Sequence, residues 1–521
     1  NIGIAAFGDD FGYKTSAEAG NNYKMFKEAM DYNFYGIKET WSYKVKTGIF
    51  GEVDVARILQ NFGKWIRLRN LGFTLISPIT SATTGSVFKR IESLIGENID
   101  KDAEKVANKF FRKHASEASL EILSLESKTV LNSLGELYGW YEPLERYQNT
   151  MYSKAVRGLG QSAFAAHQLA NFPVNTRVGL SVLANHRFFE GKLLEYREYK
   201  KLFPGKSDRD IRETWRQQTS VLDVVKLESD GRISYDYSKI SESLNNNFTE
   251  QEAKEFMDTK NASLIRGRIK AAIQKIDGQI SEEDRSMSTR NAFFSFVNIH
   301  RSWLFIAVQN KFKKRQFNTQ TGYFEEGSWV STLGYFREFL KASKQKGVIN
   351  TLSNIRKDFD SYDEVTKRNV KRTLYELAVL NAFVALTAMA LRELGDDDDD
   401  SYLFKVSSLM LIRTTNELAS SSVALHKNVR EMLDNVIVGL NSAEIVTQSP
   451  DIFSSDIVSR GRFRGMTERE RYMFRQLPIM RDYWNIYSDV EGNIKSYNYF
   501  NFVKQGNLDY TIYPFFQEED K

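Results

Sequence analysis

The sequence LYELAVLNAFVALTAMALRELGDDDDDSYLF, residues 374–404, places a long apolar run directly before five consecutive aspartates. Three interpretations compete for it: a membrane span, a buried core helix, or half of a metal site. Its uncharged part, Leu377–Leu391, amounts to about 15 residues, or roughly 22 Å of helix. A bilayer core requires about 30 Å and about 20 residues. The length therefore favours a buried core helix, and leaves a conditional membrane role open.

The aspartate run, Asp396–Asp400, is a poor metal site on spacing alone. Calcium loops alternate their ligands so that side chains converge on one ion, whereas five adjacent carboxylates diverge and repel. Gly395 suits the end of a helix, so a solvated turn is favoured. We expect an antiparallel pair: a helix over 365–394, a turn at 395–400, and a second helix with a buried stripe at i, i+4, i+7 and i+11. That stripe consists of Val429, Leu433, Val436 and Leu440.

The composition around this segment suits long helices. The chain has 521 residues, 41% hydrophobic and 27% charged, with a net charge of +5 and no cysteine. The absence of cysteine excludes disulfides, thiolate catalysis and cysteine-based metal sites. Seven prolines occur, none of them between Pro204 and Pro450. Long helices can form there without interruption, and refolding there is free of slow prolyl isomerisation.

The pattern along the chain predicts a mainly α, extended multi-helix architecture with a few short β-hairpins. Alternating flanks around turn residues place these hairpins at about 224–237, 315–326 and 486–498. The first residue is Asn1 rather than Met, so we expect a piece of a larger polypeptide or a processed product.

Changes in composition divide the chain into five expected regions. Two are helical and one is dominated by long helices, and the terminal regions are less regular. The regions are an irregular Gly/aromatic-rich segment 1–66, a helical region 67–204, a polar helical region with a hairpin 205–290, a long-helix region 291–446, and a basic/aromatic C-terminal arm 447–521.

The short motifs associated with catalysis or cofactor binding lack the sequence context that those functions require. GLGQSA, residues 158–163, has no preceding strand and no following acidic residue, and PGKS, residues 204–207, lacks the earlier glycine of a phosphate loop. DFDSYDE, residues 358–364, echoes the paired aspartates of two-metal polymerases but opens a helical stretch, where Asp and Ser act as caps. The five histidines are dispersed. No catalytic, cofactor-binding or metal-ligating residue is predicted.

Two basic–aromatic stretches give the strongest indication of a binding role. Clustered cations with interleaved aromatic rings suit phosphate neutralisation and base stacking. A solvated helix end, or a basic arm that docks on an acidic protein surface, would show the same pattern. The candidate contact residues are Lys311, Lys313, Lys314, Arg315, Arg460, Arg462, Arg464, Arg471 and Arg475.

These same two stretches carry a resemblance to a known group of proteins. HRSWLFIAVQNKFKKRQFNTQTGYFEEGSW, residues 300–329, and SRGRFRGMTERERYMFRQLPIMRDYW, residues 459–484, resemble parts of the very large virion-associated proteins of crAss-like and related short-tailed phages. SATTG, residues 81–85, is similar to theirs too. Some of these relatives are fused to virion RNA polymerases, but no catalytic motif matches here.

The resemblance implies a packaged, non-enzymatic cargo protein inside the capsid or tail, released into the host envelope or cytoplasm with the genome. Its expected partners are portal, tail and capsid proteins in a symmetric multi-copy assembly, genomic DNA, and the host membrane after ejection. Two alternatives stay open. One is the helical flank of a virion RNA polymerase or other nucleic-acid enzyme, and the other is a component of a membrane-spanning DNA conduit.

Overall fold

The computed structural model confirms a mainly α chain with short β-hairpins. Helix accounts for 73% of the residues that the structure describes, and within them strands pair only in two-stranded sheets. The described residues are 44–47, 51–54, 76–121, 129–140, 154–244, 248–278, 302–318, 321–346, 359–393, 402–421, 454–459 and 465–476.

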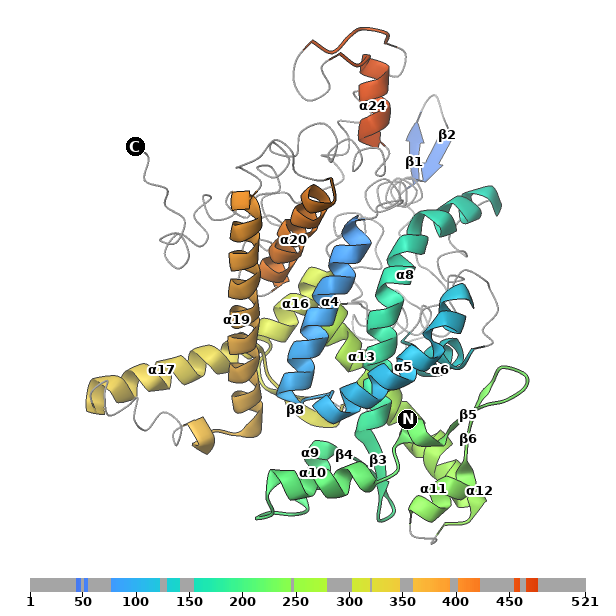
Figure 1. The fold of residues 1–521 in the computed structure, drawn as a ribbon, viewed down its shortest axis with the longest axis vertical. Helices are drawn as coiled ribbons and strands as arrows, with labels where there is room; N and C mark the ends of the chain where they lie inside the picture. The colour runs from blue at the N-terminus through green and yellow to red at the C-terminus, as the bar shows by residue number, and fades with distance from the viewer. Residues whose placement is uncertain are drawn as a thin grey trace.

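The hydrophobic core surrounds one long helix, α8 (Lys154–Asn185), which packs against helices α4, α5 and α13 (Figure 1). Every residue from Val178 to Phe188 is buried, as expected of a helix that is apolar on all sides. The neighbours are α4 (Ile76–Ile95), α5 (Lys101–Glu121), α6 (Val130–Tyr138) and α13 (Ala262–Asp277).

The polar helices that follow α8 form a layer on one end of this core. Ile240, Leu244 and Met257 from this layer belong to the same hydrophobic cluster as α5 and α8, so the expected regions 67–204 and 205–290 share one core. Its elements are β3 (His186–Phe189), β4 (Lys192–Glu195), α9 (Tyr196–Lys201), α10 (Asp208–Gln217), η2 (Val221–Val224), β5 (Val225–Leu227), β6 (Ile233–Tyr235), α11 (Tyr237–Ser243), α12 (Glu250–Glu255) and the π-helical turn η3 (Phe256–Asn261).

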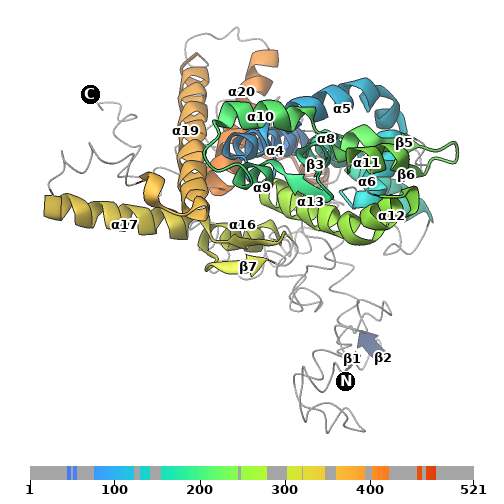
Figure 2. The same cartoon turned by 90° about the horizontal axis from the view of Figure 1, so that it is seen from below.

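A second group of helices lies beside this core. Helix α19 contacts α17, α20 and α4, and α17 extends away from the rest of the molecule (Figures 1 and 2). The elements of this part are α16 (Ser302–Phe312), β7 (Gln316–Asn318), β8 (Tyr323–Glu325), α17 (Ser328–Lys346), α19 (Glu364–Glu393) and α20 (Tyr402–Ser421). Three further elements are β1 (Lys44–Thr47), β2 (Gly51–Asp54) and α24 (Glu468–Gln476).

Two of the three expected hairpins are confirmed. β5 pairs with β6 and β7 pairs with β8, with Gly231 and Gly322 at positive φ in the turns. The third, 486–498, lies outside the described residues. The β3–β4 and β1–β2 hairpins were not predicted. In β3–β4 the two turn residues are Glu190 and Gly191, both at positive φ, and Glu is an unusual residue in that conformation.

The expected helix at 365–394 is confirmed as α19, and α20 packs against it. The prediction that it is a buried core helix holds for one face only, because 28% of its most apolar window is buried. The turn at 395–400 and the stripe from Val429 to Leu440 lie outside the described residues.

Candidate functional site

The first basic–aromatic stretch forms the end of α16 and the β7–β8 hairpin. Phe317 and Phe324 face each other across the two strands, edge to face, with ring centroids 5.4 Å apart. Both rings are about half exposed, at 53% and 54%, and Phe312 at the end of α16 is exposed by 52%. The hairpin therefore presents apolar rings to solvent, which is the geometry needed for stacking on a partner.

Most of the predicted cations here are already engaged with carboxylates. Lys311 is buried and forms an ion pair with Glu376 of α19, so its ammonium group does not face solvent. The Lys313 Nζ lies 2.9 Å from Glu325 Oε2. Arg315 forms a 2.7 Å ion pair with Asp363.

Lys314 is the remaining predicted cation of this stretch. Its side chain is exposed, and within the part of the chain that the structure describes it forms no ion pair. The surface around the hairpin is thus more aromatic than cationic, and Lys314 is the side chain best placed to meet a phosphate.

The second stretch is described only in part. Arg460, Arg462 and Arg464 lie outside the described residues, as does the side chain of Arg475. Arg471 on α24 forms a 2.5 Å ion pair with Glu468, one turn earlier in the helix. Thr467 and Glu470 begin α24, because the Thr467 amide and hydroxyl donate to Glu470 Oε2 at 2.9 and 3.0 Å.

A buried cluster of charged and polar side chains was missed by the sequence analysis. His186, Glu195 and Arg268 are 0%, 1% and 4% exposed, and they come from β3, β4 and α13. Arg268 Nη1 lies 3.0 Å from Glu195 Oε1, and its Nη2 lies 3.1 Å from both Glu198 Oε1 and the Tyr323 hydroxyl. The network ties the β7–β8 hairpin to the core.

The protonation states in this cluster follow from the donors around them. Arg268 Nη1 donates to His186 Nε2 at 2.9 Å, so Nδ1 carries the ring proton and donates to the Val182 carbonyl at 2.6 Å. Burial lowers the pKa of His186, despite the opposing effect of Glu195, and favours the neutral ring. Burial alone would raise the pKa of Glu198, but Arg268 and the Tyr323 hydroxyl hold it below its ordinary value.

This cluster has no short motif because its residues are spread from position 186 to position 323. His186 and Glu195 pair in register at the end of the β3–β4 hairpin away from its turn, and this hairpin was itself not predicted, so no sequence signal pointed to the cluster. In the folded chain these groups satisfy one another. This mutual satisfaction favours a role for the cluster in stabilising the fold over a role as a reactive site.

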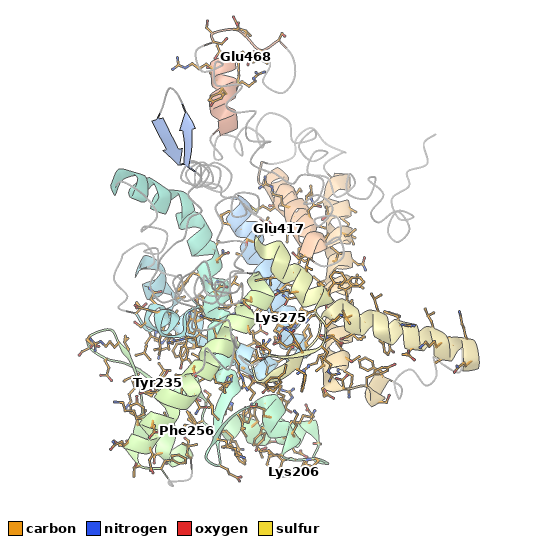
Figure 3. The ribbon with its side chains drawn as sticks, turned by 180° about the vertical axis from the view of Figure 1, so that it is seen from behind. Lys206, Tyr235, Phe256, Lys275, Glu417 and Glu468 are labelled. Atoms are coloured by element: carbon orange, nitrogen blue, oxygen red, sulfur yellow. The ribbon has the colours of Figure 1, made fainter. Side chains whose placement is uncertain are left out.

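A second buried ionic network joins α19 to the core. Arg372 forms ion pairs with Glu92 of α4 and, at 3.1 Å, with Glu97. Lys275 of α13 also pairs with Glu97, and Figure 3 shows Lys275 at the centre of the molecule. Burial would raise the pKa of Glu97, but Lys275 and Arg372 hold it well below its ordinary value. The first half of α19, which carries Arg372 and Glu376, is thus fixed against the protein body by ion pairs.

The seams between the outer helices contain buried hydroxyl pairs, beside buried apolar side chains such as Leu380, Val384 and Ile412. The hydroxyls of Thr332 on α17 and Thr373 on α19 lie 2.9 Å apart. Those of Thr387 on α19 and Thr415 on α20 lie 2.8 Å apart, and all four threonines are buried. The buried face of α19 thus mixes threonines with apolar residues, while its outward face carries large apolar side chains that an ordinary surface helix would bury.

The outward face of α19 is strongly apolar. Leu374, Leu386 and Met389 are exposed by 52%, 51% and 64%. Among the described helices, α19 alone is long and apolar enough to cross a membrane by length and composition. Contact with another surface would remove these side chains from water.

The remaining sequence motifs take structural places. GLGQSA lies within helix α8, and Ser207 of PGKS caps α10, its hydroxyl accepting from the Asp210 amide at 3.2 Å. Asp363 caps α19, its carboxylate accepting from the Thr366 amide at 3.4 Å, in line with the capping interpretation of DFDSYDE. Among the described residues no group of three or more His, Asp or Glu side chains is placed to hold a metal ion.

No protein-family model, no curated protein and no solved structure matches the chain.

Proposed function

We propose that this chain is a non-catalytic phage virion protein, an internal cargo lodged in the capsid, portal or tail lumen and ejected with the genome. The observation that carries the proposal is the exposed apolar face of α19, on which Leu374, Leu386 and Met389 face outward. Such a face belongs to a protein that works against another surface. The resemblance of residues 300–329 and 459–484 to virion-associated proteins supplies the phage context.

Three further features support a non-catalytic cargo role. The chain is mainly helical, and helices depend on local contacts that form quickly after passage through a narrow channel. It has no cysteine and no proline between Pro204 and Pro450, so two slow refolding steps are absent from that interval. In addition, the buried clusters around Arg268 and Arg372 are engaged with their own neighbours, which favours structural roles for them.

The proposed partners follow from the exposed surfaces. Portal, tail or capsid proteins, or further copies of the chain, would cover the apolar outer helices inside the particle. Genomic DNA would meet Lys314 and the rings of Phe317 and Phe324 on the β7–β8 hairpin. After ejection, the chain would reach the host envelope or cytoplasm.

Mass spectrometry of purified particles tests the proposal. We expect peptides from this chain in mature virions, and their loss from particles that have released their genome. The major capsid protein, which stays in both preparations, is the control. Absence of the chain from mature virions would overturn the proposal, and full retention in emptied particles would overturn the ejection step.

A further inference from the structure

Helix α17 carries a row of exposed apolar side chains along one face. Leu333, Phe336 and Leu340 are exposed by 56%, 46% and 59%. Their spacing of three and four residues places them on the same side of the helix. Both views show α17 extending away from the body of the protein (Figures 1 and 2).

Cations accompany this apolar row. Arg337 and Lys344 are exposed, lie within one helical turn of the row, and form no ion pair within the described residues. Lys341 is neutralised by Glu338 at 2.6 Å. A helix with an apolar face and free basic side chains beside it is typical of helices that lie at the surface of anionic membranes.

The neighbouring seams include contacts of a kind that also joins helices in lipid. Between helices in lipid, apolar packing gives little driving force, and hydroxyl pairs with close contacts hold the helices together. Thr332–Thr373 and Thr387–Thr415 are such pairs, at 2.9 and 2.8 Å. Leu333 and Leu374, each next to one of these threonines, face outward.

We infer that α17 and the outward face of α19 form a membrane-contact surface that binds anionic bilayers. This surface consists of Leu333, Phe336, Leu340, Leu374, Leu386 and Met389, with Arg337 and Lys344 directed at lipid headgroups. The contact is interfacial rather than spanning, because Arg372 and Glu376 fix the first half of α19 against the protein body. The excess of cations over carboxylates beside the apolar row favours lipid over a second copy of this chain, which itself carries a net charge of +5.

The inference rests on the proposed function for when the chain meets a membrane, namely after ejection. Binding to vesicles, in contrast, is a property of the purified chain. The two can fail separately. A chain absent from virions that still binds vesicles would overturn the function alone, and a virion protein that ignores vesicles would overturn this inference alone.

Flotation with vesicles of equimolar phosphatidylglycerol and phosphatidylcholine provides the first test, using the full chain. We expect the wild type to float with these vesicles and not with pure phosphatidylcholine. The variant Leu333→Ser/Phe336→Ser/Leu340→Ser should bind at least tenfold more weakly, because three inserted side chains are lost. Since these side chains are exposed, the variant should fold. Val106→Ser/Leu202→Ser/Leu227→Ser, which alters exposed apolar residues elsewhere, is the matched control.

Charge reversal tests the headgroup contact. Arg337→Glu/Lys344→Glu should weaken binding to the anionic vesicles roughly tenfold or more, since each cation near the surface contributes separately. Lys105→Glu/Arg209→Glu, two exposed cations outside the surface, should bind as the wild type does. Equal loss in both pairs would mean that only net charge matters, and would overturn the assignment of the surface.

A single fluorescent label distinguishes lipid from a second copy. The chain has no cysteine, so Leu340→Cys gives a unique site for an environment-sensitive dye, and Leu202→Cys gives its control. We expect a blue shift at position 340, and none at 202, when anionic vesicles are added. A shift at 340 that appears with rising protein concentration and no vesicles would identify a protein interface and overturn the inference.

Discussion

At the scale of single residues, Lys311 shows how the fold uses a cation that the sequence presents as a binding residue. The Lys311 ammonium group is buried against Glu376, and burial lowers its pKa despite the carboxylate beside it. Removing one partner of such a pair leaves the other charge buried and unpaired.

We therefore expect Glu376→Ala to lower the free energy of unfolding by about 3–5 kcal/mol. The double variant Lys311→Met/Glu376→Leu should recover most of this loss, because no charge is left unpaired. Urea unfolding followed by circular dichroism measures both. Lys313→Met, which breaks a partly exposed pair with Glu325, is the control and should cost about 1 kcal/mol or less. Equal losses for the single and double variants would contradict the explanation.

Glu417 is a second residue with a clear expected effect. It lies between α20 and α4, where its carboxylate accepts hydrogen bonds from the Thr80 and Thr84 hydroxyls, each at 3.1 Å (Figure 3). Burial raises its pKa above the ordinary value near 4.5, and the hydroxyls and Arg413 offset this only in part. The folded state therefore binds the proton more tightly than the unfolded state does.

It follows that the stability contributed by Glu417 is fully present below its ordinary pKa and is lost as the pH rises through the raised pKa. Glu417→Gln, which cannot ionise, should be less sensitive to this loss and more stable than the wild type at neutral pH. Unfolding midpoints of both proteins across the acidic-to-neutral range measure the difference. If the wild type became more stable relative to the variant as the pH rises, the pKa of Glu417 would be lowered rather than raised by folding, and the prediction would be wrong.

Of the four cations predicted to contact nucleic acid in the first basic–aromatic stretch, Lys314 is the one that forms no ion pair within the described residues. Lys314→Glu should weaken binding of single-stranded DNA about three- to tenfold at low salt and reduce the salt dependence by about one ion. Lys105→Glu, another exposed lysine, is the matched control. Fluorescence anisotropy with a labelled oligonucleotide gives both quantities. If the two variants bind alike, the hairpin is not the contact site.

At the scale of helices, two glycines in similar secondary structure should respond in opposite directions. A Cβ placed on Gly179 of α8 would lie 2.1 Å from the Cε3 of Trp140, whereas a Cβ on Gly334 of α17 meets nothing within 4 Å. Gly179→Ala should destabilise the protein by about 1–3 kcal/mol through overpacking. Gly334→Ala should stabilise it by up to about 1 kcal/mol through helix propensity. Thermal unfolding measures both changes, and matching signs would contradict the packing argument.

The elements differ in how well their sequences specify them. The hairpins at Gly231 and Gly322 could be predicted because local turn chemistry determines them. The β3–β4 hairpin could not, since Glu190 adopts a positive φ in its turn, which is unusual for that residue type. The length of α19 was predictable from its apolar run, but which face lies outward depends on Thr332 and Thr415, whose positions in sequence say nothing about α19.

At the scale of the whole molecule, the protein combines two kinds of packing. The apolar core around α8 includes Val178, Leu180 and Leu183, which are completely buried. The outer helices add ion pairs and hydroxyl pairs to buried apolar residues such as Val384 and Ile412, and they carry further apolar residues outside. The candidate site could not be predicted from sequence for the same reason, because Arg268 and Arg372 acquire their partners only when distant segments meet.

Hydrogen–deuterium exchange should resolve these two parts. We expect the slowest amide exchange in α8 around residues 178–184, and the fastest among the long helices in the projecting part of α17, residues 333–346, because local opening there breaks few buried contacts. Peptide-resolved mass spectrometry gives the comparison, and adding anionic vesicles should slow exchange in α17 while leaving α8 unchanged. Protection of α17 equal to that of α8 in the absence of vesicles would contradict this view.

The threonine pairs have one more consequence. A hydrogen bond between Thr387 and Thr415 is satisfied within the protein, so it persists whether water, another protein or lipid lies outside. An apolar seam would lose its advantage over the surroundings once those surroundings became apolar too. Helices α17, α19 and α20, joined by such pairs, can therefore pass from water to lipid and stay packed against one another. Only the contacts of their exposed side chains change.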